Sequence, residues 1–302
     1  AVGTNSLLAN TTGNYNVAMG YNALDANTTG THNTAIGDSS MSTNTTGIQN
    51  IAVGQGSFIN NTTGSNNVSI GVYALAANTT ASNNTAVGLS ALAANTTGDL
   101  NVSLGASSML DNTTGSRNVA LGAYVLTNNT TASFNTGVGD SSLGANTTGA
   151  SNTAVGEGSL DANTTADNNT AVGRDALGAN TTGADNGAVG KDALLANTTA
   201  ASNTAVGANA LQTNTTGGNN VAVGESALTA NTTAINNIGI GVASLLSNTT
   251  GASNIAIGTS ALRANTTANN NTAVGAFALT SSTAWPNTAV GYRALASNTT
   301  QN

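Results

Sequence analysis

Large apolar residues return at two fixed places in a 17-residue repeat, and the residues between them are small or polar. The repeat is copied about eighteen times, and counted from its recurring glycine as position 1 it reads G-x-x-A-L-x-A-N-T-T-G-x-x-N-T-A-V. Position 5 is Leu, Met or Phe, as in Leu24 and Met41, and position 17 is Val, Ile, Leu or Met, as in Ile36 and Val53. A disordered chain has no reason to keep these residues in phase, so the pattern predicts a folded repeat architecture.

The end of the repeat alternates in the manner of a β-strand, with positions 15 and 17 on one face and positions 14 and 16 on the other. Position 15 exchanges freely among Thr, Val and Ile (Thr34, Ile51, Val68), the β-branched residues that strands favour. Position 16 is Ala, Ser or Gly, which indicates a close approach of neighbouring backbone. No run has the length or the period of a stable helix, so each repeat is expected to form short strands and turns.

These patterns predict an all-β fold, a β-solenoid (β-helix or β-roll) of about eighteen 17-residue repeats with asparagine ladders and a thin Leu/Val core. Positions 5 and 17 are expected to supply that core, because stacked repeats share a continuous core that one repeat alone cannot form. Residues 1–302 are expected to form a single continuous solenoid array that begins and ends in mid-repeat. Position 11 alternates between Gly and Ala from Gly115 to Ala268, so a full coil could be one repeat or two repeats long.

Asparagine is the most regular residue of the repeat. It fills position 14 in every copy, and it fills position 8 in every copy except the one with Ser282. Stacked asparagines can pass hydrogen bonds between their side-chain amides along a fibre axis, and Asn tolerates the left-handed conformation of turns. We therefore expect two structural ladders that need no ligand. The position-14 ladder includes Asn16, Asn33, Asn50, Asn67, Asn84, Asn101, Asn118, Asn135 and Asn152.

Charge is sparse and follows the repeat. Charged residues make up 6% and aromatic residues 3% of the chain, and the net charge is −7. All charged residues fall at positions 2, 3, 6, 7, 12 or 13, which we interpret as outward positions. The neighbouring charges Arg174 with Asp175 and Lys191 with Asp192 are expected to form a small surface cluster. A negative chain repels the phosphates of nucleic acid, so we expect no nucleic-acid partner.

Catalytic and metal chemistry has little support. The chain has one histidine, His32, at the outward position 13, and no cysteine. We interpret His32 as a solvated turn residue, since the same position carries Tyr15 or Phe134 in other repeats. The acidic residues are scattered, and the glycines lack the context of a phosphate-binding loop. We expect no enzymatic activity, no catalytic or metal site, no cofactor and no membrane-spanning segment.

The paired threonines at positions 9 and 10, such as Thr28 and Thr29, admit three hypotheses. They cap a turn and extend the polar ladders, they complete Asn-x-Thr acceptors for N-glycosylation, or ranks of them order water and bind ice. Adjacent residues of one strand point to opposite faces, which counts against ice binding. The glycosylation hypothesis concerns the position-8 asparagines: Asn10, Asn27, Asn44, Asn61, Asn78, Asn95, Asn112, Asn129, Asn146, Asn163, Asn180, Asn197, Asn214, Asn231, Asn248, Asn265 and Asn298.

Two segments of the repeat resemble segments of known surface proteins. Asn-Thr-Ala-Val-Gly at 152–156 and 203–207, and Ala-Leu-x-Ala-Asn-Thr-Thr-Gly at 23–30, look like the Asn/Thr-rich repeats of bacterial and phage tail-fibre-like surface proteins. They also loosely resemble the Ser-Val-Ala-Ile-Gly repeats in the heads of trimeric autotransporter adhesins. The resemblance covers essentially the whole chain. It implies an extracellular fibre or stalk, frequently a homotrimer, with β-roll or β-helical structure and an attachment role.

The expected function is that of an extracellular structural fibre or filament subunit, an adhesin-like or tail-fibre-like shaft at a cell or virion surface. Self-association is expected, as a homotrimer or as a head-to-tail filament, because the chain begins at position 16 and ends at position 12 without a polar cap. A surface glycan or a host cell is the expected target. Two alternatives stay open: an N-glycosylated surface-layer or sheath fibre, and an ice-binding solenoid.

Overall fold

The computed structural model describes residues 1–283 and 286–299, in two compact units, Ala1–Ser151 and Asn152–Asn302. Each unit is an all-β parallel solenoid, and together the units contain about 16 turns. The predicted end of the array at Asn302 lies outside the described residues. Continuity of the array from residue 151 to residue 152 stays a prediction.

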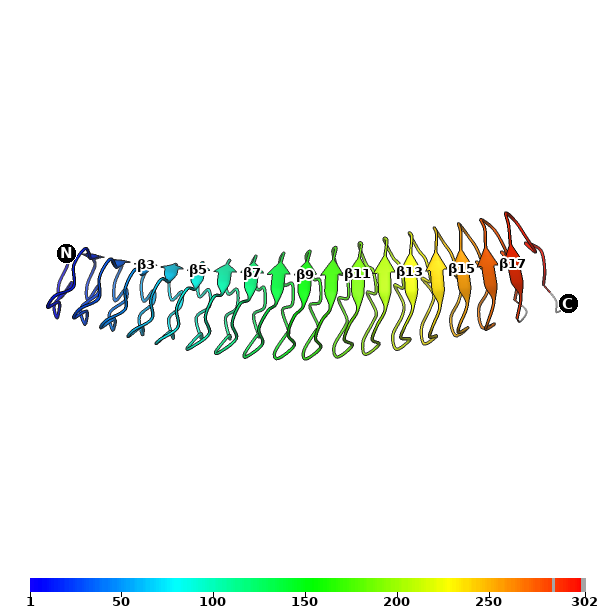
Figure 1. The fold of residues 1–302 in the computed structure, drawn as a ribbon. Coiled ribbons are helices and arrows are strands. Elements are labelled where there is room, and N and C mark those ends of the chain that lie inside the picture. The colour runs from blue at the N-terminus through cyan, green and yellow to red at the C-terminus, as the bar shows by residue number, and fades with distance from the viewer. Residues whose placement is uncertain (284–285, 300–302) are drawn as a thin grey trace. The chain divides into compact units, whose positions relative to one another are not determined.

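Each coil contributes one three-residue strand. The first unit contains β1 (Val17–Met19), β2 (Thr34–Ile36), β3 (Ile51–Val53), β4 (Val68–Ile70), β5 (Thr85–Val87), β6 (Val102–Leu104), β7 (Val119–Leu121) and β8 (Thr136–Val138). The described part of the second unit contains β9 (Thr153–Val155), β10 (Thr170–Val172), β11 (Gly187–Val189), β12 (Thr204–Val206), β13 (Val221–Val223), β14 (Ile238–Ile240), β15 (Ile255–Ile257), β16 (Thr272–Val274) and β17 (Thr288–Val290). Within each unit the strands lie side by side along one side of the coils, with the loops on the other (Figure 1).

Each strand pairs in parallel with the next strand of its unit, in a register that repeats the sequence. Ala18 pairs with Ala35, which occupies the same position of the next repeat. The last pairing joins Ala273 to Ala289, a step one residue shorter than the others. One coil is therefore a single repeat, and the alternative of a coil made of two repeats is wrong. The Gly/Ala alternation at position 11 distinguishes consecutive coils, not the two halves of one coil.

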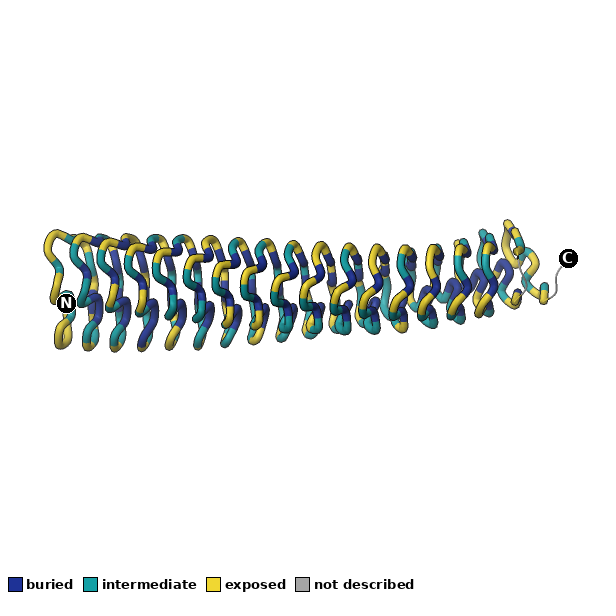
Figure 2. The backbone as a smooth tube through the Cα atoms, turned by 90° about the horizontal axis from the view of Figure 1, so that it is seen from below, coloured by how far each residue is buried: buried dark blue, intermediate teal, exposed yellow. Residues whose placement is uncertain are grey.

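Six of the 17 positions line the inside of a coil, and Figure 2 shows these buried stretches in each coil. In the second coil they are Ala23, Leu24, Asn27, Gly30, Asn33 and Ala35. The side chain at position 5 is fully buried in every coil from Leu24 to Leu279, which confirms that this position supplies the core. Burial of one such leucine stabilises the fold by about 1.5–3 kcal/mol, and stacking joins these side chains into one column.

Position 17 does not belong to the core, which corrects the predicted Leu/Val pair. Each strand buries its middle residue and turns positions 15 and 17 outward: in β1, Ala18 is buried and Met19 is 49% exposed. The limited space inside the coil explains why the small residue at position 16 faces inward and the larger residue at position 17 faces outward. At Gly239, which occupies position 16, an added Cβ would already lie 3.3 Å from the side chain of Leu228. The apolar core is therefore built from leucine and alanine, with the larger aliphatic residues outside.

The backbone at positions 1, 3, 5 and 13 of the repeat has a positive φ, and positions 1 and 5 show what that conformation requires. The position-1 glycine has a positive φ, +134° at Gly190, and a Cβ there would lie 2.6 Å from the backbone of Gly207 in the next coil. The position-5 leucine is left-handed, with φ of 55° at Leu24, a conformation that costs about 1–2 kcal/mol. Burial of the side chain and a 3.1 Å hydrogen bond from the Leu24 N–H to the carbonyl oxygen of Ser40 offset that cost.

Candidate functional site

Two asparagine ladders run through the inside of the coils and meet at one carbonyl oxygen. At position 14, the N–H of Asn50 donates to Oδ1 of Asn33 (3.0 Å), and Nδ2 of Asn33 donates to the carbonyl oxygen of Gly47 (2.8 Å). At position 8, Nδ2 of Asn44 donates to Oδ1 of Asn27 (2.9 Å) and to the same Gly47 oxygen (3.2 Å). All four asparagines are fully buried, so the prediction of two ladders is confirmed.

The position-14 ladder contains the residues predicted from the sequence. In the first unit the same backbone-to-Oδ1 bond is made by Asn33, Asn50, Asn67, Asn84, Asn101, Asn118 and Asn135. Asn16 supplies the first acceptor and is only half-buried, and in the second unit Asn152 accepts from Asn169. Each amide thus ties its coil to the next one, and a typical bond of this kind stabilises the fold by about 1 kcal/mol.

The position-8 asparagines lie inside the folded coil, and their glycosylation stays a prediction. Every position-8 side chain from Asn27 to Asn265 is fully buried. In Asn44 the two hydrogens of Nδ2 face Asn27 and Gly47, and a glycan would replace one of them. At Asn10 and Asn298 the side chain is only half-buried.

Each threonine pair has one structural member and one exposed member. The hydroxyl of Thr28 donates to the carbonyl oxygen of Thr45 in the next coil (3.0 Å), and position 9 repeats this bond along the chain. Thr29, at position 10, is exposed. The structural hypothesis is therefore supported at position 9. The pair lies in a bend and not in a strand, so strand alternation does not constrain it, and ice binding by the position-10 row stays a prediction.

The outer side of the strands carries an apolar surface that we call the strand face, formed by positions 15 and 17 of each strand. Position 17 is Val, Ile, Leu or Met in every coil, with Leu104 49%, Val189 42% and Ile257 39% exposed. Position 15 adds Thr, Val or Ile, with a single Gly at Gly187. No charged residue occupies either position in any coil. The strand face is therefore an aliphatic surface in contact with water.

Sequence reasoning missed the strand face because alternation groups positions 15 and 17 without saying which side is inside. The available signal was position 16, which is restricted to Ala, Ser and Gly throughout. A side chain that faces a narrow interior has to be small, whereas one that faces solvent does not. The hydrophobic residues at position 17 were interpreted as buried, so this position was wrongly assigned to the core.

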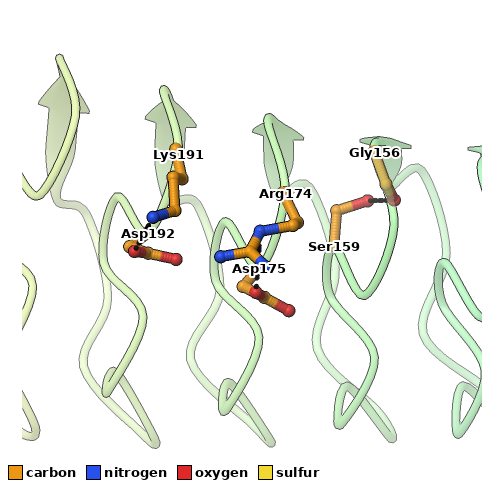
Figure 3. Close-up of polar contacts among 6 residues, drawn as sticks. All are labelled: Gly156, Ser159, Arg174, Asp175, Lys191 and Asp192. Carbon is orange, nitrogen blue, oxygen red and sulfur yellow. Dashed lines mark hydrogen bonds and ion pairs between the residues drawn. The ribbon is translucent and has the colours of Figure 1, made fainter.

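Charged side chains lie beside the strand face and not on it. Nε of Arg174 is 3.5 Å from Oδ2 of Asp175, and Nζ of Lys191 is 3.4 Å from Oδ2 of Asp192. Figure 3 shows each basic side chain turned toward the aspartate that follows it in the chain. Both ion pairs are present, and a cluster that joins the two pairs stays a prediction. The Arg174–Asp175 pair is exposed on both sides, and an exposed pair contributes about 0–1 kcal/mol to stability.

The single histidine lies away from any acidic cluster. His32 is exposed and stacks on Tyr15, with ring centroids 4.8 Å apart, which confirms its interpretation as a solvated turn residue. Within residues 1–283 and 286–299, no three His, Cys, Asp or Glu side chains form a group that could hold a metal ion. The same described residues contain no helix of the length and hydropathy that crossing a bilayer requires. The expected lack of enzymatic activity stays a prediction.

Comparisons of the chain with protein-family models, curated proteins and solved structures found no match. The architecture stands on the structure itself: a β-solenoid with a 17-residue period and buried asparagine ladders. The main features of this architecture are the ladders, which tie coil to coil, and the strand face, which is exposed to water.

Proposed function

We propose that this chain is a subunit of an extracellular structural fibre, and that copies of it pack side by side through their strand faces. The observation that carries the proposal is the outward row of Val, Ile, Leu and Met at position 17. Apolar surface in water is unfavourable by about 25 cal/mol per Å². Contact between two strand faces removes both surfaces from water.

The strand face is large enough for such a contact. The eight strands of the first unit, about 4.8 Å apart and about 10 Å long, give a face of roughly 400 Å². A patch of that size is at the scale that marks interaction sites on soluble proteins. The nine strands of the second unit add a similar area, and a stable interface needs about 800 Å² from each partner.

A second copy of this chain is the partner that fits the strand face. The rows at positions 15 and 17 repeat once per coil, so a partner has to present apolar groups at that spacing over many coils. Another copy of the chain presents the same apolar rows at the same spacing. The net charge of −7 opposes association, but no charge lies at positions 15 or 17, so packing leaves the charges at the rim.

The axial bonds suit the role of a fibre. Besides its strand, each coil is tied to its neighbour by bonds such as Asn180 Nδ2 to Asn163 Oδ1 (3.0 Å) and Thr181 Oγ1 to the carbonyl oxygen of Thr198 (3.0 Å). In-register stacks of this kind give cross-β fibres their durability. Resemblance of the repeats to tail-fibre-like and adhesin-head repeats supports a shaft at a cell or virion surface. A homotrimer fits side-by-side packing, and head-to-tail growth stays a prediction.

The test is sedimentation velocity of the full chain and of two triple variants. The strand-face variant carries Val155→Lys, Val172→Lys and Val189→Lys, all at exposed places on consecutive strands. We expect the unchanged chain to sediment as a multiple of 29.2 kDa and this variant to sediment as a monomer, because three buried ammonium groups cost more than the contact supplies.

The matched control carries Thr148→Lys, Thr165→Lys and Thr182→Lys at the exposed position 10 of the same coils. It changes the net charge by the same amount and is expected to stay assembled. A monomeric unchanged chain at micromolar concentration contradicts the proposal. So does dissociation of both variants, which would assign the effect to charge in general.

A further inference from the structure

The charge of the chain is unevenly distributed along its length. Residues 1–225 contain all twelve acidic residues and three of the five basic residues, a net charge of −9. Residues 226–302 contain Arg263 and Arg293 and no acidic residue, a net charge of +2. These two arginines therefore have no carboxylate within their own section of the chain. A basic section within an acidic protein favours an anionic ligand.

A cavity of about 370 Å³ lies within this basic section, between two consecutive coils. That volume falls within the range of about 300–1,000 Å³ in which proteins bind small molecules. The polar and aromatic lining residues are Phe277, Thr280, Ser281, Tyr292, Arg293 and Ser297. The rings of Phe277 and Tyr292 meet edge to face, with centroids 6.2 Å apart. The cavity thus combines an aromatic wall, a guanidinium group and hydroxyl groups.

The stacking of the coils holds the aromatic wall and the guanidinium beside each other. Phe277 and Arg293 both occupy position 3 and are both left-handed, with φ of 61° and 54°. The N–H of Phe277 donates to the carbonyl oxygen of Thr259, and that of Arg293 donates to the carbonyl oxygen of Ala276, both at 2.9 Å. The two side chains therefore leave the same corner of consecutive coils.

The groups in the cavity match an acidic sugar. A guanidinium binds a carboxylate through two parallel hydrogen bonds, and it binds a carboxylate better than an alcohol. The hydroxyls of Ser281 and Ser297 line the cavity, where they can bond sugar hydroxyls. The exposed ring of Tyr292 offers an apolar surface with a polar edge, which suits the C–H face of a pyranose.

We propose that the cavity between Phe277, Tyr292 and Arg293 binds a carboxylate-bearing saccharide of the uronic acid type. Arg293 holds the carboxylate, Tyr292 and Phe277 contact the sugar ring, and the serine hydroxyls bond its hydroxyl groups. The site gives the proposed fibre a point of attachment to an acidic glycan. It stands on the cavity and its charge, and does not depend on packing of the strand faces.

The experiment is a titration of the full chain with glucuronate and with glucose, followed by saturation-transfer difference NMR. The two probes share a pyranose ring and differ in the carboxylate. We expect glucuronate to bind about tenfold more tightly than glucose, the effect of one charge-assisted pair. Arg293→Asn is expected to abolish that preference. Asparagine suits the left-handed backbone and stands at position 3 in other coils, such as Asn22.

Two further variants complete the test. Tyr292→Ser is expected to weaken the binding of both probes, because the ring contact is common to them. Arg117→Asn is the matched control: it removes one positive charge from another left-handed position, remote in sequence, and is expected to bind as the unchanged chain does. Equal binding of both probes, an unaltered preference in Arg293→Asn, or an equal loss in Arg117→Asn overturns the proposal. Sedimentation of Arg293→Asn is expected to be unchanged, which keeps this test separate from that of self-association.

Discussion

The two sides of a single strand differ in the size of their residues, with small residues inside and larger ones outside. Hydrophobicity alone would predict the opposite, with the larger aliphatic residues inside. In β10, Ala171 is fully buried, whereas Val172 next to it is 36% exposed although valine is the more hydrophobic residue. The interior already holds a leucine column and two asparagine ladders, and close packing leaves room for a methyl group at position 16. A thin solenoid therefore selects its inner residues by volume and leaves larger aliphatic residues for contacts outside the coil.

The largest loss of stability is expected from Asn180→Leu, a substitution inside the coil. Nδ2 of Asn180 donates to Oδ1 of Asn163 (3.0 Å) and to the carbonyl oxygen of Gly183 (3.0 Å), and Oδ1 accepts from Asn197 (2.8 Å). Leucine leaves these three buried partners unpaired at about 1–3 kcal/mol each, so we expect a loss of about 3–9 kcal/mol. The urea midpoint, read by circular dichroism at fixed protein concentration, measures it. The exposed Thr182→Leu is the control, with an expected change within about 0.5 kcal/mol.

The second-largest loss of stability is expected from Gly190→Ala, at a point where the backbones of neighbouring coils are in contact. The new Cβ would lie 2.6 Å from the backbone of Gly207, at a φ of +134° that side chains rarely adopt. We expect destabilisation of about 2–4 kcal/mol. Gly187→Ala, three residues earlier in the chain, meets no atom within 4 Å and is expected to be neutral. Equal losses at the two glycines would show that the stack does not depend on close approach at position 1.

A direct test of the two sides of the strand is Ala171→Leu against Val172→Leu. The first substitution forces three carbons into a filled interior and is expected to cost about 1–3 kcal/mol. The second adds one carbon on the exposed side and is expected to change stability by less than about 0.5 kcal/mol. Thermal unfolding of both variants at the same concentration compares them. If the inner substitution is tolerated as well as the outer one, volume is not what excludes valine from position 16.

The smallest effect is expected outside, from Arg174→Ala. The side chains of Arg174 and Asp175 are 53% and 40% exposed, so water and salt screen their interaction. We expect a change of about 0–0.5 kcal/mol, with no further change when salt is raised. A loss above about 1 kcal/mol in urea unfolding would mean that the polar rim carries more of the stability than the asymmetry between the two sides implies.

Much of this architecture could be predicted from the sequence alone. The 17-residue period, the phase of the repeat and the position-5 core follow because a single leucine per repeat can be buried only by stacking repeats in register. Both asparagine ladders follow from the same regularity, since side chains that return at every coil lie above one another. The exposed His32 and the pairing of Arg174 with Asp175 were also predictable, because variable positions of a repeat face solvent.

Three features were decided only by the tertiary structure. In-register pairing of Ala18 with Ala35 sets the coil at a single repeat, a choice that the Gly/Ala alternation left open. Alternation placed positions 15 and 17 on one face, but which face is inside depends on the volume left by the other walls of the coil. The Asn-x-Thr signal around Asn44 is local, whereas burial of its amide depends on Asn27, one coil away. Sequence patterns show which residues occupy equivalent positions of the repeat. Only the packing of neighbouring coils determines whether such a position is buried or exposed to solvent.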